Sequence, residues 1–325
     1  MRVQKARVPG QIHPAFIVVG DDFLPIRPIQ QFLDHIENVE RSPNTIRSYA
    51  NHLKLFWEYL KDTGLDWTAV GFHELGEFVA WLRRPQSVGV KTIGKETSVR
   101  KESTVNAIIT AVSMFYSYHY RRGEVKGIPL YRFQNPAFKT YKSFLHGIAK
   151  SRPAKSHTLT LAAPTRIPKI LTADQVQSLM NACHHLRDRF LIYLMYETGM
   201  RIGQVLGLRH ADIRYWEDTI YVIPRTDNEN RVRAKTRESY GIPTDKSVMR
   251  LYTDYLSQEY GDYNSDYVFI NLWEDPLGAP MTYGSVITFF QRLSRKTGFH
   301  ATPHMLRHSY ATEKIKRGVP IAVVS

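Results

Sequence analysis

The chain has 325 residues, of which 43% are hydrophobic and 12% aromatic, so wholesale disorder is excluded. At about 100–200 residues per domain, this length indicates two domains. Lysine and arginine number 44 against 30 acidic residues, and the net charge of +14 favours a polyanionic partner, with nucleic acid as the leading candidate.

One cysteine, Cys183, excludes an internal disulfide, and its apolar helical context favours a buried structural thiol over a reactive one. The amino-terminal residues lack the apolar segment of a secretory signal, and no stretch reaches the about 20 apolar residues of a membrane span. We therefore expect a cytoplasmic protein with no membrane partner.

The charge is unevenly distributed along the chain. Residues 125–173 carry nine basic residues and no acidic one, whereas residues 251–291 carry six acidic residues and no basic one. Either run alone is as consistent with a solvated face as with a binding surface. Opposite runs in one chain favour a polarised protein whose basic segment follows a phosphate backbone and whose acidic segment faces away from it.

The first part of the chain shows helical periodicity. Four helices are predicted: one opened by Pro28, one begun by Ser42 and Pro43 and ended before Gly64, one over residues 72–82, and one from Ser103. Residues 85–101, rich in Gly, Lys and Thr, are predicted to form a mobile basic loop between the last two helices. Together these helices indicate a small bundle.

The second part mixes helices with short strands. Thr172 and Gln175 fit a capping box that opens a helix, and Gly199 follows a helix over residues 190–197. Further helices are predicted over residues 202–208, 246–258, 283–297 and 304–317, and strands over residues 219–223, 231–235 and 239–242, with a polar turn at 227–230. The predicted fold is mostly α, with a small antiparallel β-sheet in the second domain.

Residues 143–168 mix Ser, Thr, Pro, Gly and Ala with little periodicity, as an interdomain linker does. The predicted organisation is therefore an amino-terminal extension over residues 1–27, a helical domain over 28–142, a basic linker over 143–169 and a mixed α+β domain over 170–325.

Several catalytic devices are absent from the sequence. It has no GxxxxGK[ST] phosphate loop, no HExxH and no CxxC pair, which disfavours nucleotide hydrolysis and zinc chemistry. The pairs His184–His185 and His300–His304 are weak metal candidates, since adjacent helical residues point apart and Pro303 interrupts the second pair. We expect no metal and no cofactor.

Two stretches carry cationic side chains in a pattern that suits phosphate chemistry. Arg201 closely follows Gly199, which is predicted to end one helix, and it stands at the start of the next helix. The helix dipole does not favour a cation at a helix start, so this arginine needs another explanation. His304 and Arg307 lie three apart on one helical face, just inside a helix start that already favours an anion. Two guanidiniums and an imidazole can surround one phosphate diester and neutralise the charge of its pentavalent transition state. A lone HxxR, by contrast, is more often a pair of surface or ion-paired residues.

The stretches TGMRIGQVLGLR and TPHMLRHSYAT resemble the two signature boxes of the tyrosine recombinase, or phage integrase, family. SPNTIRSYANHLKLFWEYL resembles the opening helix of that family's core-binding domain, and the resemblance runs from near Pro28 to Gly318. The amino-terminal extension and the loop over residues 85–101 most resemble transposase A of site-specific transposons within the family. The resemblance implies a helical core DNA-binding domain and a mixed catalytic domain, which cleave and rejoin DNA through a 3′-phosphotyrosine intermediate.

By this resemblance, Arg201 and Arg307 hold the scissile phosphate, and His304 assists proton transfer at the nucleophile. Lys235 precedes the strand that ends at Pro243, as the family's lysine does, and would act as general acid on the 5′-oxygen. Cations of the protein replace a metal in this chemistry, and covalent catalysis conserves the energy of the broken bond, so no ATP is required.

The implied partner is double-stranded DNA, gripped by the two domains as a clamp. A tetramer on DNA, accessory recombination proteins and a place on the bacterial nucleoid are also implied. The basic residues expected to contact DNA are Arg47, Lys54, Lys95, Arg100, Lys101, Lys150, Arg152, Lys155, Arg231, Arg233 and Arg237.

Two features depart from the family pattern. Gln204 stands three residues after Arg201, where an acidic residue is usual. No tyrosine follows Tyr310, whereas the family's nucleophilic tyrosine lies one helix beyond the HxxR motif. We therefore expect a chain shortened at its carboxyl terminus, monomeric without DNA and unable to form the covalent intermediate alone. The alternatives are a non-catalytic DNA-binding regulator on the same fold and a type IB topoisomerase.

Overall fold

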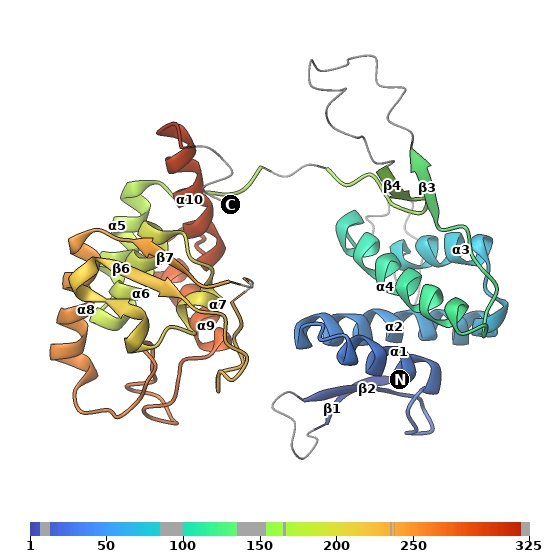
Figure 1. Ribbon diagram of the computed structural model, residues 1–325. Helices are drawn as coiled ribbons and strands as arrows, with labels where there is room; N and C mark the ends of the chain where they lie inside the picture. The colour runs from blue at the N-terminus through green and yellow to red at the C-terminus, as the bar shows by residue number, and fades with distance from the viewer. Residues whose placement is uncertain are drawn as a thin grey trace. The chain divides into compact units, whose positions relative to one another are not determined.

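The computed structural model describes residues 1–6, 14–84, 100–134, 154–164, 167–234, 236 and 238–319. The chain divides into two compact units, Met1–Thr165 and Arg166–Ser325, so the division falls inside the predicted linker. The strands and helices before Thr165 belong to the first unit, and the helices from α5 (Ala173–Ala182) onward belong to the second (Figure 1).

The first unit is built on the four predicted helices, and their existence is confirmed. They are α1 (Arg27–Asn38), α2 (Pro43–Thr63), α3 (Phe72–Arg83) and α4 (Glu102–Arg121), with a short 3₁₀ turn, η1, at Trp67–Ala69. Local chemistry sets their ends: the Ser42 hydroxyl accepts a hydrogen bond from Thr45 N at 3.2 Å, and Gly64 ends α2 in the left-handed conformation at φ 69°.

Aromatic side chains fill the core of the first unit. Phe56 of α2, Phe78 of α3 and Phe115 of α4 are fully buried. The rings of Phe56 and Phe78 meet edge to face with their centroids 5.0 Å apart, and Phe56 meets Tyr116 in the same way at 5.8 Å. These contacts join three helices from separate parts of the sequence into one bundle.

Two strand pairs accompany this bundle, and the sequence patterns predicted neither. Strand β1 (Arg2–Ala6) pairs antiparallel with β2 (Ala15–Val19), within the predicted amino-terminal extension. Strand β3 (Tyr131–Gln134) pairs antiparallel with β4 (Ala154–His157), which lies within the predicted linker. Asn106 of α4 holds the chain after β4, since its amide accepts from Leu161 N at 2.8 Å and donates to Leu161 O at 2.9 Å.

The second unit is mostly helical, as predicted. Its helices are α5 (Ala173–Ala182), α6 (Leu186–Thr198), α7 (Ile202–Val205), α8 (Lys246–Tyr255), α9 (Tyr283–Thr297) and α10 (Pro303–Lys316). The predicted capping box is present, because Thr172 and Gln175 each bond the other's backbone N–H, at 3.0 and 3.2 Å. Helices α7 and α8 end earlier than predicted, and a π-helical turn at Leu256–Tyr260 follows α8.

One small antiparallel sheet belongs to this unit. Its order is β5 (Ile213–Arg214), β6 (Thr219–Val222), β7 (Tyr240–Pro243), with Tyr221 opposite Gly241. The predicted strand over residues 231–235 is wrong for its described part, because residues 231–234 form no strand and β6 pairs directly with β7. Arg231 is in the left-handed conformation at φ 60°, which breaks an extended run.

Helix α6 lies at the centre of the second unit. Phe190, Leu191, Ile192, Leu194 and Met195 are all buried, so this helix is apolar on several faces, as a helix surrounded by others must be. It packs against α5, α8 and α10 (Figure 1). Within the described ranges, no helix has the length and apolar character needed to cross a membrane.

The end of α6 offers a test of this packing. Gly199 is left-handed at φ 64°, and an added Cβ would lie 2.2 Å from Cδ1 of Tyr310 on α10. Gly298, which ends α9, is also left-handed at φ 77°, but a Cβ there would meet nothing within 4 Å. We expect Gly298→Ala to lower the free energy of unfolding by about 1–2 kcal/mol through backbone strain alone. Gly199→Ala should cost about 1–3 kcal/mol more through the clash with the ring.

Urea denaturation of the two variants measures the difference. Equal midpoints for Gly199→Ala and Gly298→Ala would contradict the close approach of Tyr310 to the end of α6.

Candidate active site

Arg201 is the N-cap residue of α7, two positions after the left-handed Gly199 that ends α6. Its backbone N–H donates to Oε1 of Gln204 at 2.8 Å. The other end of that amide, Nε2, donates to the hydroxyl of Tyr240 on β7 at 2.9 Å. Gln204 is only 3% exposed, so the amide joins the start of α7 to the sheet from inside the unit.

This geometry gives a physical account of Gln204, which departs from the family pattern. A carboxylate at this position could accept from Arg201 N, but it could not donate to Tyr240. The amide does both. The start of α7 is therefore held by a neutral group, and no negative charge is added next to Arg201.

Arg307 of α10 reaches the same turn. Its Nη1 donates to the carbonyl oxygen of Gly199 at 2.5 Å, so α10 is tied to the chain two residues before Arg201. Burial, and then the positive charge of Arg201, lower the pKa of Arg307 from its ordinary value. The structure thus brings together Arg201 and Arg307, which are 106 positions apart in the sequence.

No acidic side chain neutralises this pair in the part of the chain that the structure describes. Neither Arg201 nor Arg307 forms an ion pair there, although Asp212 and other carboxylates of the unit are paired elsewhere. Two partly buried guanidiniums of like charge repel each other, and a bound anion would relieve that repulsion. The arrangement therefore suits a phosphate.

His304 lies in the first turn of α10, one position after Pro303. Thr302 caps this helix by accepting from Met305 N at 3.3 Å. The ring of His304 is exposed and stacks on His308 with centroids 5.2 Å apart and an interplanar angle of 10°. Burial, followed by the charges of His304 and Arg307, lowers the pKa of His308, so His308 favours its neutral form. His304 is thus supported by a stacked neutral ring, close to an anion-favouring helix end.

Several predicted site residues lie outside the described residues. These are Lys95, Lys150, Arg152, Lys235 and Arg237; Lys155 is on β4, opposite Phe133 in the register, but its side chain is also outside the description.

The other predicted DNA contacts differ in their surroundings. Arg47 and Lys101 are exposed, on α2 and at the start of α4. Lys54 forms an ion pair with Glu58 at 2.8 Å, and Arg100 donates to Leu82 O at 3.0 Å. Arg231 is exposed and Arg233 is half-buried, both in the segment before Lys235.

Tyr310 packs against the turn that carries Arg201. Its ring covers Gly199, as shown by the contacts that a Cβ there would make. Burial, and then the charge of Glu197, raise the pKa of the Tyr310 hydroxyl, which disfavours the phenolate. Both observations suit a packing role for this side chain.

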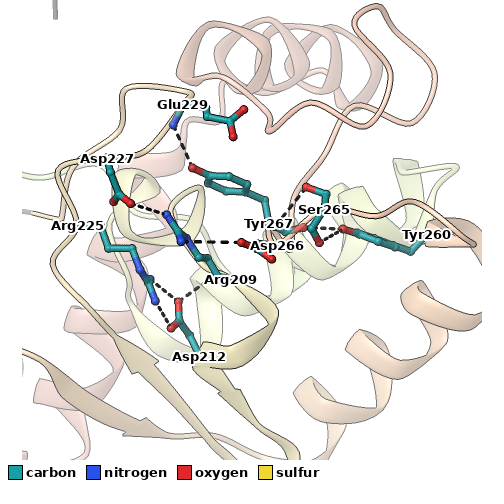
Figure 2. A network of polar contacts seen from close by, with 9 residues as sticks. All are labelled: Arg209, Asp212, Arg225, Asp227, Glu229, Tyr260, Ser265, Asp266 and Tyr267. Atoms are coloured by element: carbon teal, nitrogen blue, oxygen red, sulfur yellow. Dashed lines mark hydrogen bonds and ion pairs between the residues drawn. The ribbon is translucent and has the colours of Figure 1, made fainter. Parts of the chain in front are cut away.

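A polar network that the sequence analysis missed joins residues that follow α7 to the chain after β6 (Figure 2). Asp212, 1% exposed, accepts two hydrogen bonds of 2.6 Å from the guanidinium of Arg225, and a third of 2.9 Å from Arg209 N. Arg209 in turn donates to Asp227 at 3.1 Å. In the sequence, only the polar residues 227–230 hinted at it, and they were interpreted as a simple turn.

Cys183 is a buried thiol, as expected. It is 3% exposed at the end of α5, and burial raises its pKa to about 12, so the reactive thiolate is strongly disfavoured. Among the described residues, no group of three His, Cys, Asp or Glu side chains could hold a metal ion.

Comparison with known proteins bears on this site. The phage integrase family model matches residues 169–325, and the model of the phage integrase N-terminal SAM-like domain matches residues 29–123. Transposase A from transposon Tn554 of Staphylococcus aureus is 37% identical over 325 residues, spanning 100% of this chain and 89% of that protein. The chain belongs to the phage integrase family.

More distant members agree with this assignment. Tyrosine recombinase XerA of Pyrococcus horikoshii is 24% identical, over 94% of this chain and 84% of its own. Among solved structures, the Tn1549 transposon integrase in complex with circular intermediate DNA has a TM-score of 0.61 at 15% identity, over 91% of this chain and 89% of that one. A lambda integrase dimer bound to a core site has a TM-score of 0.59 at 14% identity, over 92% of each chain. These two structures share the fold.

The contribution of the Gln204 amide to the stability of this phage integrase family member can be tested directly. Gln204→Glu keeps an acceptor for Arg201 N, and the Tyr240 hydroxyl can turn to donate to the carboxylate, so we expect little change in the free energy of unfolding. Gln204→Leu leaves the half-buried Arg201 N–H without its acceptor and should cost about 1–3 kcal/mol. Denaturation in urea measures both variants, and a Gln204→Leu protein as stable as the unmodified one would show that the hydrogen bonds of the amide contribute nothing.

Proposed function

We propose that this protein is a site-specific DNA recombinase of the transposase type, which cleaves and rejoins double-stranded DNA through a 3′-phosphotyrosine intermediate. The observation that carries the proposal is the pairing of Arg201 and Arg307 at one turn without a described carboxylate partner. The 37% identity to a transposase over the whole chain supports transposition, and the DNA in the related solved structures supports DNA as the partner.

Each residue has a role in this proposal. Arg201 and Arg307 hold the non-bridging oxygens of the scissile phosphate and neutralise the charge that develops in the transition state. His304, in the first turn of α10, assists removal of the proton from the nucleophile. The tyrosine oxygen bonds to phosphorus as the bond to the 5′-oxygen breaks, and Lys235 gives that oxygen its proton. Energy is conserved in the new phosphodiester, so the reaction reverses without ATP or a metal.

The nucleophilic tyrosine is, in this proposal, none of the 19 tyrosines of these 325 residues. Tyr310 is the nearest candidate in sequence to the HxxR motif, and its packing against Gly199 favours a structural role. The protein would act in the cytoplasm on the bacterial nucleoid, where it would form a tetramer on DNA with accessory recombination proteins. The 325 residues alone would be monomeric without DNA.

The two arginines provide the central test of the mechanism. In protein expressed from its natural reading frame, Arg201→Ala and Arg307→Ala should each slow cleavage more than a hundredfold, or about 3 kcal/mol, because each acts on charge that develops in the transition state. Affinity for the target site should change far less. Cleavage of a radiolabelled duplex and gel-shift titration measure the two quantities.

Arg292→Ala is the matched control, because this exposed arginine of α9 pairs with Glu274 at 3.6 Å and should leave both quantities unchanged. A covalent adduct mapped to Tyr310 would sink the assignment of the nucleophile. Adduct formation that survives removal of either Arg201 or Arg307 would sink their catalytic role. Site binding without any adduct from the natural protein would instead favour a DNA-binding regulator.

The basic residues of the predicted linker provide a second test. Changing Lys150, Arg152 and Lys155 to Ala should weaken binding to all DNA sequences alike, and should reduce the slope of log K against log salt by about 0.9 for each phosphate that the protein no longer neutralises. Fluorescence anisotropy across a salt series measures this slope. Weakening confined to one DNA sequence would argue for base recognition, and an unchanged slope would exclude an interaction of these residues with phosphates.

A further inference from the structure

The chain between β6 and Lys235 pairs with no strand over its described residues, yet it is held at several points. Arg209 donates to the carboxylate of Asp227, and Glu229 N donates to the Tyr267 hydroxyl at 3.0 Å (Figure 2). Arg209 also stacks over the ring of Tyr267, with its guanidinium carbon 5.5 Å from the centroid. The start of the segment is thereby fixed to the body of the second unit.

Asn230 makes the central attachment. Its Nδ2 donates two hydrogen bonds of 2.9 Å, one to Leu206 O at the end of α7 and one to Met281 O, just before α9. Its Oδ1 lies 3.4 Å from Val232 N and accepts from it. A planar group with two N–H donors and one acceptor is needed for this set of contacts, and asparagine is the shortest side chain that has one.

The segment then turns back against α7. Asn228 is buried, and its side-chain Nδ2 donates to Val232 O at 3.0 Å. Its backbone carbonyl oxygen accepts from Arg231 N at 2.9 Å. An added Cβ at Gly203 of α7 would lie 2.8 Å from Arg233 O, and one at Gly207 would lie 3.2 Å from Asn228 Nδ2. The backbone of the segment therefore lies directly on α7, at a distance that excludes an intervening side chain.

Helix α7 has Arg201 at its start, and Asn230 binds its end. We propose that Asn230 is a positioning residue for DNA cleavage. By binding the end of α7, it holds against this helix the backbone segment that leads to Lys235. The short helix α7 would then have Arg201 at its start and would hold, through Asn230, the described backbone that leads to Lys235. This inference rests on the proposed function, in which Lys235 protonates the leaving group.

The test uses protein expressed from its natural reading frame and two DNA substrates. One substrate is the ordinary site, and the other has a bridging sulfur in place of the 5′-oxygen, a leaving group that needs no proton. Asn230→Ala removes the amide, whereas Asn230→Asp keeps its shape but has no N–H to donate. Asn271→Ala is the control, because Asn271 makes a similar amide contact, with Pro276 O at 3.3 Å, in another loop.

We expect both Asn230 variants to slow cleavage of ordinary DNA by about a hundredfold, since displacement of a catalytic group by about 1 Å has an effect of this size. Cleavage of the sulfur-bridged DNA should stay within about threefold of the unmodified protein, because its leaving group does not require the displaced acid. Asn271→Ala should cleave both substrates normally. Site affinity should be unchanged in all three variants.

Gly203→Ala provides an independent variant, because it displaces the segment at Arg233 O and leaves the Asn230 contacts in place. It should show the same rescue by sulfur. Equal slowing on both substrates, or slowing that follows site affinity, would show that Asn230 only supports folding and would overturn the inference. If the Asn230 variants cleave normally while Lys235→Ala is slow and is rescued by sulfur, the inference about Asn230 fails and the acid role of Lys235 stands. A Lys235→Ala defect that sulfur does not rescue would overturn the acid role of Lys235 and this inference together.

Discussion

The hydrogen bond from Arg307 to the carbonyl oxygen of Gly199 is the contact on which the candidate active site depends. It joins α10 to the turn between α6 and α7, and so brings residues from two distant stretches of the sequence to one place. The left-handed glycine makes it possible in two ways. It turns the chain so that α7 can begin with Arg201, and it leaves room for the ring of Tyr310.

Holding two guanidiniums close together has an energetic cost. The pKa of Arg307 is lowered by burial and by Arg201, which means that the folded protein disfavours its charge relative to water. Elsewhere in the unit a buried charge is paired, as Asp212 is with Arg225. The two guanidiniums repel each other in the free protein. An anion that binds to both relieves this repulsion and is stabilised by it.

The sequence predicted what depends on local patterns. Caps at Ser42 and Thr172, the glycine stop at Gly199 and the periodicity of α2, α4 and α9 all indicated helices that the structure contains. The spacing of His304 and Arg307 on one helical face was likewise a local property, and its partner Arg201 was found by its odd position at a helix start.

Features that depend on tertiary contacts were not predicted. The alternating sequence RVRAK is typical of a strand, but the amides of Asn228 and Asn230 draw this segment onto α7, and no pattern in a single sequence shows which carbonyls a buried amide will meet. Strand β5 has two residues, too few for periodicity to be detected. The strands β1 and β4 were missed because polar and basic residues make up most of their sequence.

Gln204 has a consequence for how the active site responds to acid. A carboxylate at this position would gain a proton as the pH fell, and its bond to the start of α7 would weaken just where the arginines must be held. An amide has no such equilibrium, and its bonds to Arg201 N and Tyr240 keep their direction at every pH at which the protein stays folded. Position 204 therefore adds no titrating group beside the two arginines, and an acid limb in the rate of DNA cleavage would have to arise from another residue, such as His304 or His308.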